Sequence, residues 1–170
     1  MTRILGIDPG SRITGYGVID LRGGHLAYVD SGCIHLEGKS LPQRLKILFE
    51  SVRAVIAACR PEDMAVEQVF MHRNPDSALK LGQARGAAIC AGVMAGLEVS
   101  EYTPRAVKQA VVGYGAADKA QIQHMVCALL RLDRPPPADA ADALAVALCH
   151  GHTRSTLHRL GQAIPLRRRR

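Results

Sequence analysis

The sequence predicts an α/β fold in which a mixed five-stranded sheet carries helices on both faces. Three observations favour this fold. Three apolar runs joined by glycine-containing turns come first, a pattern typical of an antiparallel strand meander. A further apolar run follows an amphipathic helical pattern, which favours a strand parallel to the first. The chain of 170 residues, with 48% hydrophobic and 22% charged side chains, suits one domain with a full-sized core.

The first three strands are expected at residues 3–8, 15–19 and 25–35. The first is a buried apolar run that ends at an aspartate. The Pro-Gly-Ser-Arg segment 9–12 predicts a turn into the second strand, and Gly23-Gly24 a turn into the third.

An amphipathic helix follows, because apolar residues recur at spacings of four and three: Leu41, Leu45, Leu48, Val52, Val55 and Cys59. Pro61 ends this helix, and residues 64–67 then form a short strand. Ligand sites gather where parallel strands joined by helices end. We therefore expect Asp8 and Glu67, which each end such a strand, to meet at one edge of the sheet.

A second helix is predicted over residues 76–96, and its C-terminal half is crowded with Gly and Ala. Small side chains permit close approach, either for packing on the sheet or for self-association; the residues alone favour packing. Residues 99–102 predict the fifth strand, followed by a short helix over 105–112. Another helix begins at residue 117 or 118 and ends near 132, and the last is expected from 138 to about 152.

Positive charge is concentrated at the C-terminus. Of the formal net charge of +7, six units come from arginines within residues 151–170, which contain no acid. We expect residues 1–153 to form one folded domain and residues 154–170 a basic, flexible tail. This distribution favours a polyphosphate partner, although a soluble basic protein with a solvated arginine tail has the same composition. Aromatic residues are only 4% of the chain, so any base-stacking role falls chiefly on Phe70 and the four tyrosines.

The cysteines indicate a reducing compartment. They are far apart and form no C-x-x-C pair, which favours buried thiols over disulfides or a zinc site: Cys33, Cys59, Cys90, Cys127 and Cys149. No export signal is visible, and the longest uncharged apolar stretch is well short of the roughly 20 residues that span a bilayer. We therefore expect a cytoplasmic protein that does not enter a membrane.

Four carboxylates carry the chemistry: Asp8, Glu67, Asp139 and Asp142. The last two are three residues apart at a predicted helix start, so they share one face of that helix. A core-facing cluster of acids is costly unless a cation neutralises it. Carboxylates from three elements suit a pair of Mg²⁺ ions, which hydrolyse phosphodiesters by activating water and neutralising the leaving oxygen.

Each acid also has an ordinary explanation. Asp139 and Asp142 fit a helix cap and first turn, Glu67 fits a solvent-facing edge strand, and Asp8 fits a turn. The Asp-Pro-Gly turn also resembles the phosphate loop of actin-like ATPases and sugar kinases. Those proteins need two related domains, and 170 residues leave room for one.

Motif segments spread over nearly all of residues 3 to 150 identify the chain more closely: 6–17, 67–70, 74 with 76–86, 107–109 with 111–113, and 138–145. In these residues and in their order, the chain resembles the RuvC family of Holliday-junction resolvases. The resemblance implies a ribonuclease-H-like fold for residues 1–153. It also implies a Mg²⁺-dependent endonuclease that resolves four-way DNA junctions by paired, symmetric cuts in recombination and repair.

The resemblance also implies residue roles. The four acids would be the metal ligands and catalytic residues, with two Mg²⁺ ions per site for which Mn²⁺ can substitute. Lys119 would act in catalysis and, with Lys108, contact the DNA backbone near the scissile phosphate. Phe70 would stack on an unpaired base at the crossover. Weaker candidates for backbone contacts are Arg73, Lys80 and Arg85.

The same resemblance implies a homodimer, whose twofold axis matches that of a junction, and contacts with the RuvA and RuvB branch-migration proteins. It raises the case for self-association through the small-residue helix at 77–96. His150 and His152 are expected to be structural and not metal ligands. Two questions stay open: how metal ligation divides between Asp139 and Asp142, and whether the arginine tail adds DNA affinity or is merely disordered. A junction-binding protein without activity is the main alternative.

Overall fold

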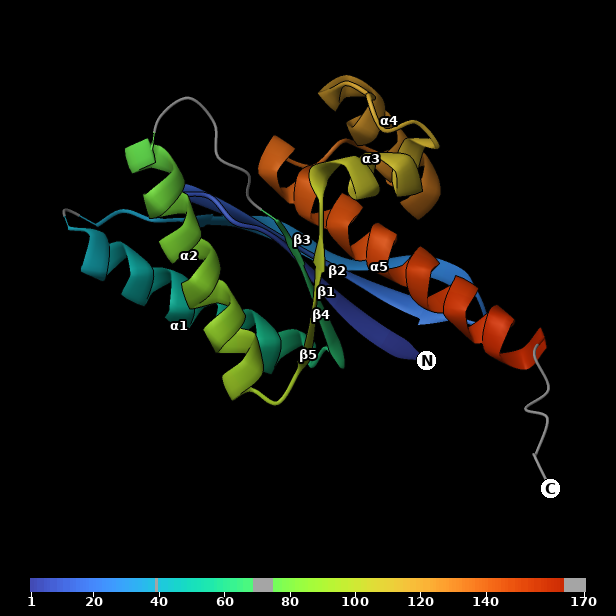
Figure 1. Cartoon of the computed structure of the whole chain (residues 1–170), viewed down its shortest axis with the longest axis horizontal. Helices are drawn as coiled ribbons and strands as arrows, with labels where there is room; N and C mark the ends of the chain where they lie inside the picture. The colour runs from blue at the N-terminus through green and yellow to red at the C-terminus, as the bar shows by residue number, and fades with distance from the viewer. Residues whose placement is uncertain (39, 69–74, 164–170) are drawn as a thin grey trace.

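The computed structural model describes residues 1–38, 40–68 and 75–163, and these form a five-stranded sheet between two helical layers (Figure 1). The strands are β1 (Thr2–Asp8), β2 (Ile13–Arg22), β3 (His25–His35), β4 (Asp63–Glu67) and β5 (Glu98–Tyr102). Their order across the sheet is β3-β2-β1-β4-β5. The predicted mixed sheet and α/β class are confirmed.

The sheet is antiparallel on one side of β1 and parallel on the other. β1 and β3 each pair antiparallel with β2, whereas β1, β4 and β5 run parallel. The register places Ile7 beside Val66, so Asp8 and Glu67 follow at the same edge of the sheet. Their convergence is therefore a consequence of strand order and register.

Helices cover both faces, as Figure 1 shows. Helices α1 (Leu41–Cys59) and α2 (Pro75–Met94) pack on one face. Helices α3 (Pro104–Val112), α4 (Lys119–Leu130) and α5 (Ala138–Ala163) pack on the other. Alternate residues of β1 feed the two cores: Ile4 joins the α5 side, and Leu5 and Ile7 join the α1 side.

Glycines let α5 lie directly on the sheet. A Cβ on Gly6 would stand 2.2 Å from the Ala143 carbonyl oxygen, and one on Gly15 would stand 1.8 Å from the Asp139 carbonyl oxygen. Gly15 is also the β2 partner of Asp8. The close approach therefore sets the N-terminal end of α5, with Asp139, beside the strand end that carries Asp8.

Side-chain caps fix where the short helices of that layer begin. Thr103 accepts a hydrogen bond from the Ala106 N–H at 3.1 Å and starts α3. Asp118 starts α4 through a capping box with Gln121. Because Lys119 is the first residue of α4, this cap determines where its side chain begins.

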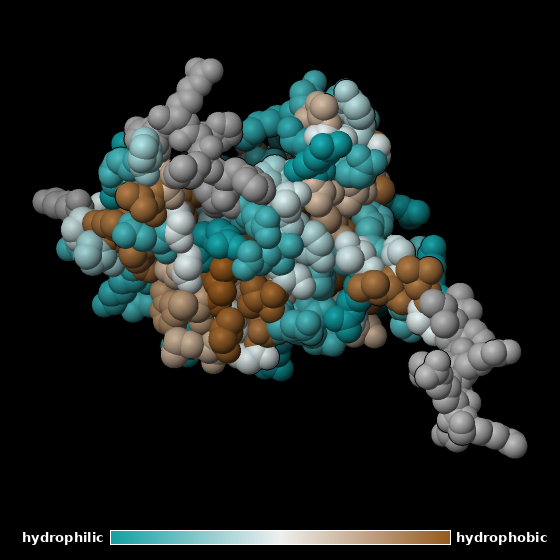
Figure 2. Space-filling model, in the orientation of Figure 1, coloured by the Kyte–Doolittle hydropathy of each residue, from teal (hydrophilic) through white to brown (hydrophobic). Residues whose placement is uncertain are grey.

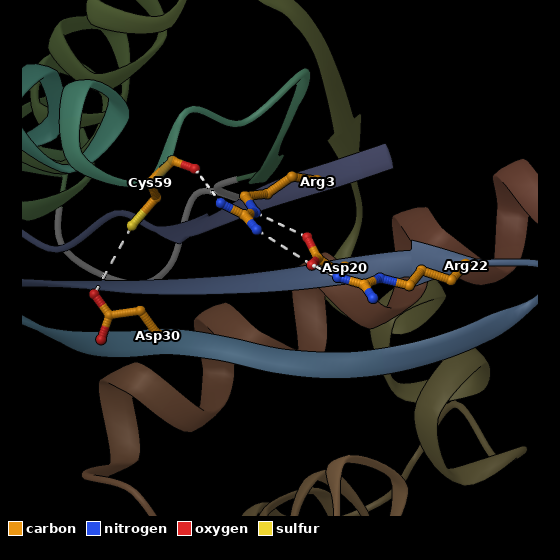
Figure 3. A network of polar contacts seen from close by, with 5 residues as sticks. All are labelled: Arg3, Asp20, Arg22, Asp30 and Cys59. Atoms are coloured by element: carbon orange, nitrogen blue, oxygen red, sulfur yellow. Dashed lines mark hydrogen bonds and ion pairs between the residues drawn. The ribbon is translucent and has the colours of Figure 1, made fainter. Parts of the chain in front are cut away.

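A network of polar contacts holds the N-terminal end of β1, the end away from Asp8 (Figure 3). The Arg3 guanidinium donates to both carboxylate oxygens of Asp20, at 2.8 and 3.2 Å, and to the Cys59 carbonyl oxygen at 2.7 Å. Arg22 donates to Asp20 at 3.1 Å. The hydrogen bonds from Arg3 hold the pKa of the buried Asp20 carboxyl below its usual range. This network ties β1, β2 and the end of α1 together.

Two predicted elements have wrong bounds. The second strand extends from Ile13 to Arg22 because β3 pairs with it from end to end, while β1 pairs with it from Gly15 to Leu21. The last helix does not stop near His152 but continues to Ala163. No proline interrupts it before Pro165, and the Thr153 and Ser155 hydroxyls bond to carbonyls one turn back. Residues 164–170 lie outside the described part of the chain. No helix in the described part is long and apolar enough to cross a membrane.

Candidate active site

A pocket of about 270 Å³ opens at the carboxyl edge of β1 and β4. Three predicted acids line it, Asp8 from β1, Glu67 from β4 and Asp142 from α5. Lys108 of α3 and Lys119 of α4 complete its charged lining. The structure thus brings together five of the residues that the sequence singles out, from five different elements.

Burial and like charge act together on the acids. Burial, followed by the negative charges of Glu67, Asp142 and Asp139, raises the pKa of Asp8 to about 8. Burial also raises the pKa of Glu67. A hydrogen bond between the two carboxyls raises the pKa of Asp8 and opposes the rise at Glu67, so Asp8 is the partner that keeps the proton. The site therefore holds more negative charge than its own cations offset.

Lys119 is the nearest compensating cation. Its Nζ donates to Asp142 Oδ2 at 3.3 Å, and the Asp142 charge raises the pKa of Lys119. The charges of Lys119 and Lys108 both oppose the rise in the pKa of Glu67. The Lys119 side chain is 81% exposed, and an ion pair with such an exposed partner is weak. The ammonium is therefore free to exchange Asp142 for an incoming anion.

Asp139 occupies a neighbouring position. It is half-buried on α5 above Gly15 and contributes to the raised pKa of Asp8, but it does not line the pocket. Asp142 is therefore the acid of this pair that faces Glu67 across the pocket.

The carboxylate oxygens suit hard divalent cations such as Mg²⁺ and Mn²⁺, and a bound cation would offset the crowding of acids that keeps Asp8 protonated. Within residues 1–38, 40–68 and 75–163, no three Asp, Glu, His or Cys side chains form a group that could hold a metal ion as they stand. The donor chemistry fits a metal, and its ligand geometry would need side-chain adjustment, starting with the Lys119–Asp142 pair.

Sequence reasoning missed the apolar walls of the pocket, which come from α3, α4 and α5: Pro104, Val107, Ile122 and Ala145. Val107 and Ala145 stand out in the sequence only as members of motif segments, and Ile122 belongs to none of them. No local signal distinguishes an apolar residue at the rim of a site from one in the core.

Four other residues are predicted to contact DNA. Phe70 and Arg73 fall outside the described residues. Lys80 pairs with Asp76 one turn away on α2, and Arg85 pairs with Glu101 of β5. Neither Lys80 nor Arg85 lines the pocket. His150 does not line the pocket: it is buried and hydrogen-bonded to Tyr102 and Asp63, in line with the structural role expected of it.

Comparison with known proteins gives a consistent result. The family model for crossover junction endodeoxyribonuclease RuvC matches residues 4–150. The RuvC of Methylococcus capsulatus is 59% identical over 164 residues, covering 96% of this chain and 99% of that protein. The RuvC of Photobacterium profundum is 60% identical over 171 residues, covering 100% and 99%.

Solved structures agree. Thermus thermophilus RuvC in complex with a Holliday junction substrate superimposes with a TM-score of 0.86 at 34% identity, covering 92% of this chain and 96% of that one. The yeast mitochondrial Holliday junction resolvase Ydc2 shares the fold, with a TM-score of 0.66 at 9% identity over 96% of this chain and 86% of that one. The ribonuclease-H-like fold and the family resemblance are confirmed, and this chain belongs to the RuvC family of crossover junction endodeoxyribonucleases.

Proposed function

We propose that this chain resolves four-way DNA junctions by divalent-metal-dependent hydrolysis of two opposed phosphodiesters, acting as a homodimer. One observation carries the proposal: acids from three separate elements converge on one pocket, and their charges with burial raise the pKa of Asp8 to about 8. A fold retains such repulsion when a cation offsets it. The choice of a four-way DNA junction as the substrate follows from the family to which the chain belongs.

Asp8, Glu67 and Asp142 would hold the metal, with Asp139 beside them. Mg²⁺ bound here neutralises developing charge on phosphate oxygens and lowers the pKa of bound water, and Mn²⁺ suits the same oxygen ligands. The oxygen donors come from three different elements, so the fold itself orients the site.

The two lysines would meet the DNA. Lys119 leaves its exposed pairing with Asp142 and donates to a non-bridging oxygen of the scissile phosphate, which opposes charge build-up there. Lys108, which also lines the pocket, contacts the neighbouring DNA backbone. Phe70 as a base-stacking wedge, and Arg73, Lys80 and Arg85 as backbone contacts, complete the proposed interface on the strength of the family motifs.

The exposed face of α2 supports the homodimer. Leu79 is 68% exposed, Val93 58% and Met94 72%, and Figure 2 shows apolar surface over this helix. A Cβ on Gly82 or Gly86 would meet nothing within 4 Å, so a partner backbone has room to approach. A twofold dimer through this face would present two equivalent sites to two opposed strands. Cytoplasmic action with RuvA and RuvB belongs to the same proposal.

Cleavage of a synthetic four-way junction, with Mg²⁺ titrated from zero in the presence and absence of EDTA, tests the function. Wild type should produce paired nicks only with metal. Asp8→Asn, Glu67→Gln and Asp142→Asn should each lose about a hundredfold or more in single-turnover rate, the scale of losing a central electrostatic group. All three should still bind the junction, since shape and phosphate contacts do not require hydrolysis.

Wild-type cutting by the Asp8→Asn and Glu67→Gln proteins would refute the metal mechanism. Binding by wild type without any cutting in Mg²⁺ or Mn²⁺ would instead identify a junction-binding protein without activity.

A further inference from the structure

A buried polar relay crosses the layer between α5 and the sheet. The Tyr102 hydroxyl lies 2.9 Å from His150 Nδ1, and His150 Nε2 lies 3.1 Å from Asp63 Oδ2. Arg154, one turn further along α5, also bonds to Asp63. His150 is 8% exposed and Asp63 6%, so these two side chains hydrogen-bond to protein groups in place of water.

The direction of these hydrogen bonds follows from chemistry. The ionised Asp63 carboxylate only accepts, so His150 Nε2 carries the proton it donates. In a neutral imidazole Nδ1 is then the acceptor, and the Tyr102 hydroxyl donates to it. Burial raises the pKa of Tyr102, which keeps the phenol protonated for this role. Every member of the relay is satisfied in one consistent arrangement.

The relay runs beside the strand that carries Glu67. Tyr102 ends β5 and pairs in register with Glu67, the last residue of β4. Asp63 is the first residue of that same strand. His150 connects both from α5, about two turns beyond Asp142. Tyr102 also precedes Thr103, the N-cap of α3, the helix that carries Lys108.

Helix α5 has a particular need for directional contacts. Its contacts with Gly6 of β1 and Gly17 of β2 are made by backbone atoms and by the apolar side chains of Ala147 and Leu144. Apolar contact is non-directional, so it fixes how close the helix lies better than how it is rotated. Hydrogen bonds from His150 and Arg154 to Asp63 resist both rotation and sliding. A rotation of α5 by one residue, about 100°, would turn Asp142 out of the pocket.

We propose that Tyr102, His150 and Asp63 are positioning residues that hold α5 in register with β4 and β5, so that Asp142 faces Glu67 and Asp8 ready to take a cation. The inference rests on the proposed metal-dependent function and assigns it a supporting structure. None of the three residues lines the pocket.

Tyr102→Phe tests the relay with the smallest change, because it removes one hydroxyl and keeps the buried ring. Mn²⁺ binding to the DNA-free protein at 25 °C, measured by calorimetry, should weaken by about 3–10-fold, somewhat less than the loss of a group in direct contact with a metal ligand. The metal concentration for half-maximal single-turnover cleavage should rise by the same factor. The rate at saturating metal should stay within about twofold of wild type, because the pocket acids are intact.

Tyr16→Phe is the matched control. It removes a tyrosine hydroxyl that lies 3.3 Å from Asp30, among the residues packed on the α1 and α2 side of the sheet. Its metal affinity should equal that of wild type. His150→Gln is a second variant, because the amide can still donate to Asp63 while the Tyr102 contact is lost. Its Mn²⁺ affinity should equal that of Tyr102→Phe and should be higher than that of His150→Ala.

Two outcomes overturn the inference. One is wild-type Mn²⁺ affinity in folded Tyr102→Phe and His150→Gln, whatever their thermal midpoints, because a merely stabilising network would move only the midpoint. The other is an equal loss of affinity in Tyr16→Phe. If wild type itself neither binds Mn²⁺ nor cleaves junctions, the proposed function fails first, which distinguishes the two failures.

Discussion

At Asp8, burial and three neighbouring carboxylates all favour the protonated form, and the pKa rises from an ordinary 3.8 to about 8. The folded protein therefore binds a proton that the unfolded chain releases between these two values. By linkage, the free energy of unfolding falls as pH rises from about 4 to 8, and it stays lower above pH 8. The metal-free site thus destabilises the fold where the protein is expected to work.

Asp8→Asn should remove this pH dependence. In EDTA at pH 9 the thermal midpoint of the variant should exceed that of wild type by about 3–8 °C, at roughly 2–4 °C per kcal/mol for a domain of this size. Near pH 4, where the folded protein keeps Asp8 protonated and in the unfolded chain this residue is only about half ionised, the difference between the two midpoints should be much smaller. Asp133→Asn, at an exposed position, should change neither value. An equal offset at both pH values would show that charge is not the cause.

The sequence identifies these acids because each lies at a strand end or at a helix start, where periodicity is easily read. The sequence does not reveal which of these acids lines the pocket. Asp139 and Asp142 are equivalent in the pattern, and only the position of α5 above Gly15 separates a pocket acid from its neighbour.

At the scale of elements, α5 and β2 meet through glycine, and this contact determines where the site forms. An alanine at position 15 would place its Cβ 1.8 Å from the Asp139 carbonyl oxygen, a backbone atom that cannot move independently of the helix. The helix would have to lift from the sheet next to Asp8.

Gly15→Ala should therefore cost about 3 kcal/mol or more, the upper end for overpacked cores, and lower the thermal midpoint by about 6–12 °C. Cleavage by the folded fraction at 25 °C should fall as well, since Asp139 moves with the helix. Gly161→Ala on the same helix meets nothing within 4 Å and should be neutral or slightly stabilising. Wild-type stability and cleavage in Gly15→Ala would disprove the close contact.

Element boundaries were predictable where one local pattern decides them. Pro61 and the repeat from Leu41 to Cys59 fixed α1 from sequence alone. The end of α5 was not predictable, because the apolar stripe fades after His152, where hydroxyl hydrogen bonds and the Arg154–Asp63 pair continue the helix. Tertiary contacts of this kind leave no periodic signal.

At the scale of the whole molecule, apolar surface is exposed over α2 and near the end of α5 (Figure 2). The α2 surface has two open glycine positions, Gly82 and Gly86, on the same helix as Leu79 and Val93, whereas the described end of α5 has one, Gly161. The proposed homodimer buries the α2 face. The sequence showed the small residues but not which side of the helix the sheet covers.

The double variant Leu79→Glu, Val93→Glu should therefore sediment as a monomer. A monomer presents one site, so junctions should accumulate single nicks instead of resolved duplexes, while thermal stability stays within a few degrees of wild type under monomeric conditions. Leu157→Glu, at a leucine that is 64% exposed near the end of α5, should remain dimeric and resolve junctions normally. A double variant that stays dimeric would place the interface elsewhere.

The guanidinium network around Asp20, drawn in Figure 3, involves Arg3 near the start of β1, whereas the crowded carboxylates gather around Asp8 at its end. Opposite charges pair at one end of the strand, whereas carboxyl groups of like charge crowd together at the other end, where the reaction is expected. Heat-resistant variants should therefore be sought by reinforcing the end with paired charges. Relieving the crowding at the other end would raise the melting temperature and leave an inert protein.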